Sequence, residues 1–130
     1  MIEYGFTKKS NLSFETAVDR VIEALKKEGF GILTTIDIKE KFKEKLGIDF
    51  QNYVILGACH PSSAHKAILA EENIGLMLPC NVVVFEKNDH VVLSVIKPSV
   101  AMDMIENDEL KQIAISVESK LESVFESIGD

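Results

Sequence analysis

The stretch Tyr53-Val54-Ile55-Leu56-Gly57-Ala58-Cys59-His60-Pro61-Ser62-Ser63 decides the fold of this chain, and the other segments are read outward from it. Residues 53–58 are apolar on both alternating faces, which is typical of a strand inside a sheet. Pro61 suits the first position of a helix, where its missing N–H costs nothing. The stretch therefore predicts a central strand, a sharp turn and a helix, with Cys59 at the junction.

Two segments near the N-terminus predict a strand and a helix. Ile2, Tyr4 and Phe6 alternate with other residues at the period of a half-buried strand. Residues 14–25 place their apolar side chains on one helical stripe. Ser13 supplies a side-chain oxygen that can cap the start of this helix. The chain is therefore expected to begin with a strand followed by a helix.

A second strand and a short helix are predicted next. Residues 30–36 are rich in β-branched side chains, which favours a strand. Asp37 with Glu40 three residues later is typical of a capping box, so a helix is expected to open there. The side chains expected on its buried face are Ile38, Phe42 and Leu46.

A hairpin and a short helix are predicted after the central stretch. Residues 81–86 and 91–96 read as two strands that turn at Asn88-Asp89. Both faces of these strands are apolar. We expect one face to meet helices and the other a second subunit, because an apolar sheet face is rarely left in water. Pro98 then suits the start of a short helix through residue 105.

The last helix is predicted to begin with Asp108 as its cap and to pack on its own domain. Its apolar residues step by four and three, which is also the spacing of a coiled coil, but they span fewer than three heptads. Packing within the chain is therefore the favoured interpretation. The residues of this stripe are Leu110, Ala114, Val117, Leu121, Val124 and Ile128.

The composition indicates a single cytoplasmic domain, residues 1–130, that binds neither nucleic acid nor membrane. A net charge of -7 disfavours binding to a phosphate backbone. No stretch approaches the ~20 apolar residues of a membrane span. No apolar run follows a basic start, and two cysteines cannot form a disulfide framework. We therefore expect reduced thiols.

The two cysteines are the residues most able to carry chemistry. Cys59 is expected at a helix start, where free N–H groups and the helix dipole favour a thiolate and also suit a small anion. A protonated His60 would favour the thiolate as well. The competing interpretation is a buried, unreactive cysteine, and it applies more strongly to Cys80 in its apolar surroundings.

A soft metal site is a further hypothesis. Cys59, His60 and Cys80, with one of Met77, Met102 or Met104, would form a ligand set suited to Cu(I) or Zn if the fold brought them together. The spacing matches no zinc-finger pattern, because neither cysteine has a cysteine partner two to four residues away.

The central stretch and a second one resemble the signature of the DUF302 family, small bacterial and archaeal domains of unknown function. The similar residues are 55–61, Ala64, Ala67 and Leu76-Met77-Leu78-Pro79-Cys80-Asn81-Val82, and the similarity runs from about Tyr4 to Ile105. The resemblance implies an α+β fold, TBP-like, with helices packed on one face of an antiparallel sheet, usually in a homodimer. The family commonly has Asn where this chain has His60, and it brings no established catalytic residues.

Two interpretations of function therefore stand beside the metal site. The favoured one is a homodimeric binding or sensing module with a small-molecule ligand near the two motifs. The other is a thiol-dependent enzyme or redox protein that uses Cys59 with Cys80 as its partner. The sequence does not decide the cofactor or whether the protein is an enzyme. The residues predicted to form the ligand site are Cys59, His60, Pro61, Ser62, Ser63, Cys80 and Asn81.

Overall fold

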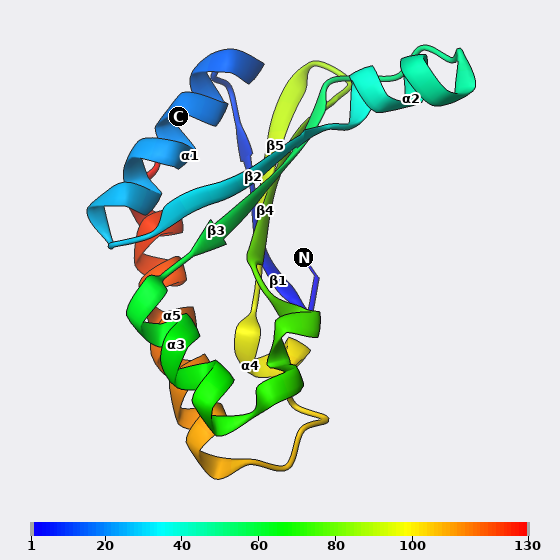
Figure 1. Cartoon of the computed structure of the whole chain (residues 1–130). Coiled ribbons are helices and arrows are strands. Elements are labelled where there is room, and N and C mark those ends of the chain that lie inside the picture. The colour runs from blue at the N-terminus through cyan, green and yellow to red at the C-terminus, as the bar shows by residue number, and fades with distance from the viewer. Residues whose placement is uncertain (1, 130) are drawn as a thin grey trace.

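The computed structural model describes residues 2–129 and shows an antiparallel sheet with helices on one side (Figure 1). The strands lie in the order β1-β5-β4-β3-β2. In chain order the elements are β1 (Gly5–Ser10), α1 (Phe14–Lys27), β2 (Gly31–Asp37), α2 (Ile38–Leu46), β3 (Tyr53–Cys59), α3 (Pro61–Ala70), the 3-10 helix η1 (Glu72–Met77), β4 (Cys80–Lys87), β5 (His90–Ile96), α4 (Pro98–Ala101) and α5 (Asp108–Ser127).

The sheet confirms the predicted position of the central stretch. β3 lies between β2 and β4, so both of its edges are paired. β4 and β5 form the predicted hairpin, in which Lys87 pairs with His90 and Asn88 adopts a positive φ of 58°. The fold is therefore the expected α+β arrangement around an antiparallel sheet.

The main core lies between the sheet and helices α1 and α5. Every second residue of β3, β4 and β5 points into it, as the pleat of a strand requires. The helices contribute buried leucines such as Leu25 and Leu121. Apolar burial of this kind is the dominant favourable term in folding. The strand residues in this core are Val54, Leu56, Ala58, Cys80, Val82, Val84, Val91, Leu93 and Val95.

Helix α5 packs on its own domain, as the spacing of its apolar residues predicts. All six residues of the predicted stripe are buried. The predicted cap is wrong by one residue, because the side-chain oxygen of Asn107, and not that of Asp108, accepts a hydrogen bond from the Leu110 N–H at 3.0 Å. Asp108 instead occupies the first helical turn, where a negative charge is favourable.

Helix α2 differs most from its predicted environment. Asp37 caps the helix as predicted, since its carboxylate accepts a hydrogen bond from the Glu40 N–H at 3.0 Å. The predicted face is not buried: Ile38 and Phe42 are only half-buried, and Leu46 is 65% exposed. Figure 1 shows the reason: α2 lies beyond the end of β2 and β3, away from α1, α3 and α5. An amphipathic sequence pattern predicts an apolar helix face, but it does not contain the distance between that face and the rest of the core.

Two other boundaries differ from prediction. The first strand begins at Gly5, so Tyr4 lies outside it and is exposed. The helix that begins at Pro98 ends at Ala101, well short of residue 105. No helix within residues 2–129 is long and apolar enough to cross a membrane.

The face of the sheet opposite the helices carries many apolar side chains. Its rows follow from the register: Ile36, Ile55 and Val83 are neighbours across three strands. In the next row the Tyr53 and Phe85 rings stack with centroids 5.1 Å apart. We call this side the open face, because in Figure 1 no helix between residues 2 and 129 covers it.

Candidate functional site

The junction between β3 and α3 is built as the sequence predicts. Cys59 ends the strand, His60 takes the N-cap position and Pro61 is the first helical residue. The side chain of His60 accepts no hydrogen bond from the backbone N–H groups of α3. The start of α3 is therefore not capped in the way that an Asn at this position would cap it.

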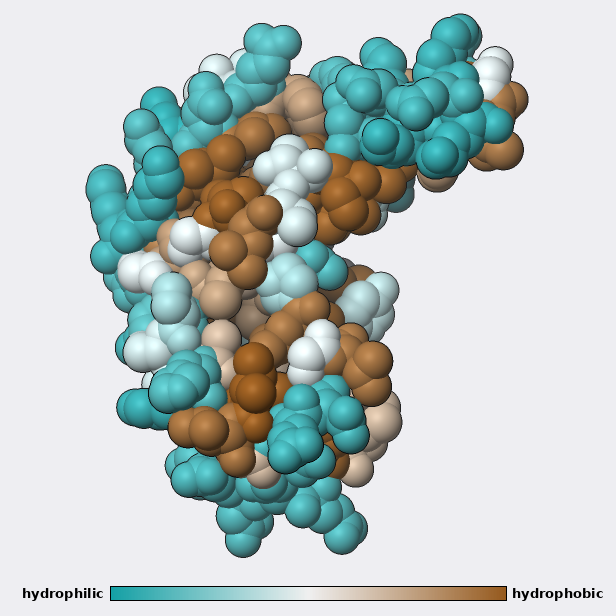
Figure 2. Space-filling view, viewed as in Figure 1, coloured by the Kyte–Doolittle hydropathy of each residue, from teal (hydrophilic) through white to brown (hydrophobic). Residues whose placement is uncertain are grey.

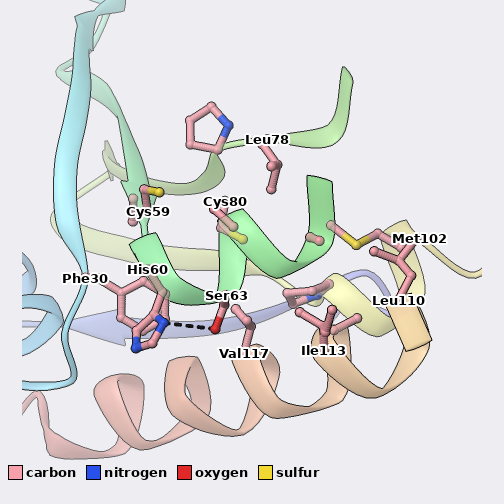
Figure 3. Close-up of a pocket in the computed structure, with 16 residues that line it drawn as sticks. Phe30, Cys59, His60, Ser63, Leu78, Cys80, Met102, Leu110, Ile113 and Val117 are labelled. Carbon is pink, nitrogen blue, oxygen red and sulfur yellow. Dashed lines mark hydrogen bonds between the residues drawn. The ribbon is translucent and has the colours of Figure 1, made fainter. Parts of the chain in front are cut away.

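The His60 ring is instead held between α3 and the turn before β2. Its Nδ1 atom shares a hydrogen bond with Ser63 Oγ at 2.9 Å, and the ring packs edge-on against Phe30 with centroids 5.3 Å apart (Figure 3). A Cβ atom on Gly29 would lie 3.1 Å from His60 Nε2. His60 thus ties the first turn of α3 to the end of α1.

Gly57 and Pro79 explain why the two motif stretches occur together. A Cβ atom on Gly57 would fall on Thr34 Oγ1 and would lie 2.7 Å from Pro79 Cγ. The Pro79 ring and the Thr34 side chain therefore occupy the space that any other residue would need. The Gly-Ala-Cys and Leu-Pro-Cys stretches are two halves of one packing arrangement between β2, β3 and β4.

The two motif stretches also line one small apolar pocket (Figure 3). Its cavity volume is about 30 Å³, which is a few times the ~10–15 Å³ that one water molecule needs. Apolar side chains make up most of its wall. The lining residues are Phe30, Ala58, Cys59, His60, Ser63, Ala64, Ala67, Leu78, Pro79, Cys80, Pro98, Met102, Leu110, Ile113, Ala114 and Val117.

The two cysteines occupy different environments. Cys80 is buried, and desolvation together with the neighbouring Cys59 raises the pKa of its thiol to about 11. Cys80 is therefore a neutral thiol at physiological pH and a poor nucleophile, because the thiolate is the reactive form. Cys59 is half-buried at the end of β3 and keeps some access to solvent.

Comparison with known proteins places this arrangement in a family. The family described as "Domain of unknown function DUF302" matches residues 6–128, which is nearly the whole chain. The chain belongs to the DUF302 family. A crystal structure of an uncharacterized conserved DUF302 protein from Bacillus stearothermophilus has 31% sequence identity and a TM-score of 0.89. The match covers 96% of this chain and 98% of that one. No curated protein matches the chain.

The structure brings together only part of the ligand site predicted from the sequence. Cys59, His60, Ser63 and Cys80 line the pocket. The remaining predicted residues, Pro61, Ser62 and Asn81, are exposed and lie outside its wall. A strand presents only alternate residues to one side, and a helix presents residues three or four apart, so neighbours of the lining residues face elsewhere.

The hypothetical metal site does not form as written. Among the described residues, 2–129, no three His, Cys, Asp or Glu side chains gather around a common point. The Nδ1 atom of His60 is already engaged by Ser63. Of the three candidate methionines, Met102 lines the pocket, whereas Met104 is 78% exposed.

The part of the pocket wall that α4, α5 and the turn before β2 provide was not predicted from the sequence. Ala114 of α5 lies across the pocket from Ala64 and Ala67 of α3, and small residues on both helices leave the space open. The sequence did contain one indication of this wall, because Ala114 is the one small side chain in the α5 stripe. Reading it required knowing that α3 and α5 are neighbours, which the structure supplies.

Proposed function

We propose that this DUF302 chain is a binding module that takes a small apolar molecule in the pocket between α3, α5 and the sheet. The observation that carries the proposal is the meeting of both motif stretches at one pocket whose wall is largely apolar. Cys80 fits this function as a neutral wall residue, since its raised pKa of about 11 keeps the thiol uncharged. The His60–Ser63 pair supplies the polar rim.

The size of the pocket limits the ligand. A cavity of about 30 Å³ has room for about two water-sized groups, whereas a cavity of ~150 Å³ binds benzene. A larger ligand therefore requires one wall to move. Helix α3 is the wall that would move, because Ala67 is its only buried residue and no side chain caps its start. Elements with few buried apolar contacts open most easily.

An NMR titration of the full chain with benzene tests this function. We expect saturable shifts of the backbone amides of Ala64, Ala67 and Ala114. Ala64→Leu should fill the pocket and weaken benzene binding at least ten-fold, while Met102→Ala should enlarge the pocket and strengthen it. Ala70→Leu is the matched control, because Ala70 lies on the same helix outside the pocket wall. Equal binding by the Ala64→Leu variant, or no binding by any variant, would contradict the proposal.

A thiol reaction at Cys59 is the second candidate function. It is favoured by the partial exposure of Cys59 at the pocket, but Cys80 cannot serve as a reactive partner while its thiol stays protonated. Iodoacetamide labelling of the native chain, resolved by peptide mass spectrometry, distinguishes the two functions. If Cys59 is labelled fast and benzene prevents this labelling, the thiol reaction and the binding of apolar molecules take place at the same pocket. Labelling only after unfolding would exclude the thiol function.

We also propose that the module acts as a homodimer. The support is the apolar open face, where Ile55, Val83 and the stacked Tyr53 and Phe85 rings lie side by side. A contiguous apolar surface on a soluble domain usually marks an interaction site. Sedimentation velocity on the full chain tests this: a species with twice the monomer mass is expected, and a monomer at all concentrations would contradict it.

A further inference from the structure

The arm, which we define as residues 36–50, buries almost nothing within its own chain. It comprises the end of β2, helix α2 and the link to β3. Helix α2 has no buried residue. Figure 2 shows the arm projecting from the body with hydrophobic residues at its far end and beside its base. The exposed large apolar residues of the arm are Ile36, Leu46, Ile48 and Phe50.

The arm nevertheless has a conformation that its own local contacts stabilise. Asp37 caps the start of α2, and Gly47 closes its end in the left-handed conformation with a φ of 67°. The Phe42 and Phe50 rings meet edge to face with centroids 5.0 Å apart, and Lys43 pairs with Asp49 at 3.2 Å. A nine-residue helix is marginal in water by itself. These local contacts hold the arm in one shape, so its apolar side chains stay presented to a partner.

The open face is the second unpartnered apolar surface of the same chain. It is most apolar on the side of β2, β3 and β4, where Ile36, Ile55 and Val83 form one row. The row ends in polar Ser94 and Thr7 on β5 and β1, whose hydroxyls hydrogen-bond at 2.8 Å. The apolar part of the open face therefore adjoins the base of the arm, and Ile36 belongs to both.

Helix α2 carries more lysines than glutamates, although Asp37 and Asp49 bring the net charge of the whole arm to zero. Helix α2 carries Lys39, Lys41, Lys43 and Lys45 against Glu40 and Glu44, whereas the whole chain has a net charge of -7. Opposite charges on two surfaces favour their encounter and suppress pairing with unsuitable partners. An acidic protein is thus a suitable partner for α2, and a second copy of this chain is one.

We infer that the arm of each copy packs over the open face of a second copy, in a dimer with twofold symmetry. The inference rests on the proposed homodimer and adds which surfaces meet. Twofold symmetry makes every contact occur twice, so a single docking covers both arms and both open faces. Stable interfaces bury ~800 Å² on each partner, which neither four arm residues nor one face row supplies alone.

Sedimentation velocity of the full chain and three variants tests the arm. Ile48→Glu places a charge on the arm, and Val83→Lys places one on the open face. Leu69→Glu is the matched control, because Leu69 on α3 is equally apolar and 73% exposed but lies on neither surface. We expect the dimer dissociation constant to rise at least ten-fold for Ile48→Glu and for Val83→Lys, and to stay within two-fold for Leu69→Glu.

The outcomes separate the arm from the homodimer. A monomeric wild-type chain overturns both proposals. A dimer that Val83→Lys weakens and Ile48→Glu does not keeps the homodimer and overturns the role of the arm. Equal weakening by Leu69→Glu overturns the assignment of surfaces.

A measurement on the wild-type chain guards against variants that do not fold. Hydrogen exchange at low and high protein concentration should show residues 38–46 of α2 exchanging more slowly at high concentration, with α3 unchanged. Exchange of α2 that does not depend on concentration would overturn the arm contact.

Discussion

The two ends of the β2–β3 ribbon differ in what their apolar side chains touch. At one end Gly57, Ala58 and Cys59 lie against Pro79 and the helices, and the space between them is filled except for one small pocket. At the other end the ribbon leads into the arm, where α2 packs mainly against β3 and none of its residues is buried. The contrast teaches that apolar patterning is alike at both ends, whereas burial depends on distance from the helical layer.

A pair of leucine truncations gives the largest expected difference between the two regions. Leu121→Ala removes a fully buried side chain of α5 and should lower the free energy of unfolding by about 3 kcal/mol. Leu46→Ala in the arm should change it by less than about 0.5 kcal/mol at protein concentrations where the chain is a monomer, because Leu46 is exposed there. Urea unfolding measures both. Comparable losses would mean that the arm is buried in solution, and a loss at Leu46 that vanishes on dilution would assign that burial to a partner.

Gly57→Ala tests how tightly the motif end is filled. The new methyl group would collide with Thr34 and Pro79, so we expect a loss of about 2 kcal/mol from overpacking. Gly31→Ala is the control on the neighbouring strand, because a Cβ there would meet no atom within 4 Å. It should change the free energy of unfolding by less than about 0.5 kcal/mol. Equal effects of the two substitutions would show that strand propensity, and not contact with Pro79, sets the need for glycine.

The Cys80 thiol makes the stability of the body depend on pH at alkaline values. Its pKa is raised from 9.0 to about 11 in the folded chain, so the unfolded chain loses this proton first as pH rises. The contribution of the Cys80 thiol to the free energy of unfolding is therefore fully present below pH 9. It declines as the pH rises from 9 toward 11. Between pH 8 and pH 10 we expect wild type to lose about 1 kcal/mol more than Cys80→Ala. Parallel pH profiles for the two proteins would show that the pocket admits water to this thiol.

Two lysines give the smallest expected difference. Lys8 Nζ donates hydrogen bonds to the carbonyls of Phe125 and Ile128 at 3.1 and 2.6 Å, which satisfies the end of α5. Lys8→Met should therefore cost about 1 kcal/mol, measured by thermal unfolding. Lys43→Met removes the exposed ion pair with Asp49 in the arm and should cost less than about 0.5 kcal/mol. A larger cost for Lys43→Met would mean that this ion pair is shielded from water by a partner.

Local signals predicted those parts of the fold that depend on near neighbours in the chain. Ser13 accepts a hydrogen bond from the Thr16 N–H at 3.2 Å, Pro61 begins α3 and Asn88 lies in the hairpin turn, all as expected. The α5 stripe is buried as expected. These features follow from backbone geometry within a few residues, so a single sequence carries them.

Four of the seven residues predicted for the ligand site line the pocket, and its opposite wall was not predicted. Cys59, His60, Ser63 and Cys80 were found because they are adjacent to the motif stretches. Phe30, Met102 and Ala114 were not predicted as wall residues, because they belong to segments that are distant in sequence from the two motif stretches. The His60 ring turned toward Phe30 and Ser63, since an edge-on aromatic contact and a hydrogen bond were available there.

The sequence by itself determined the order of strands and helices along the chain, the caps of α1 and α2, and the family to which the chain belongs. Those properties depend on residue types at short spacing. Only the tertiary structure decided that α2 stands clear of the body, that Cys80 lies in a water-poor pocket and that Gly57 has no room for a side chain. Each of these is a distance between residues remote in the chain, which is set by the packing of whole elements.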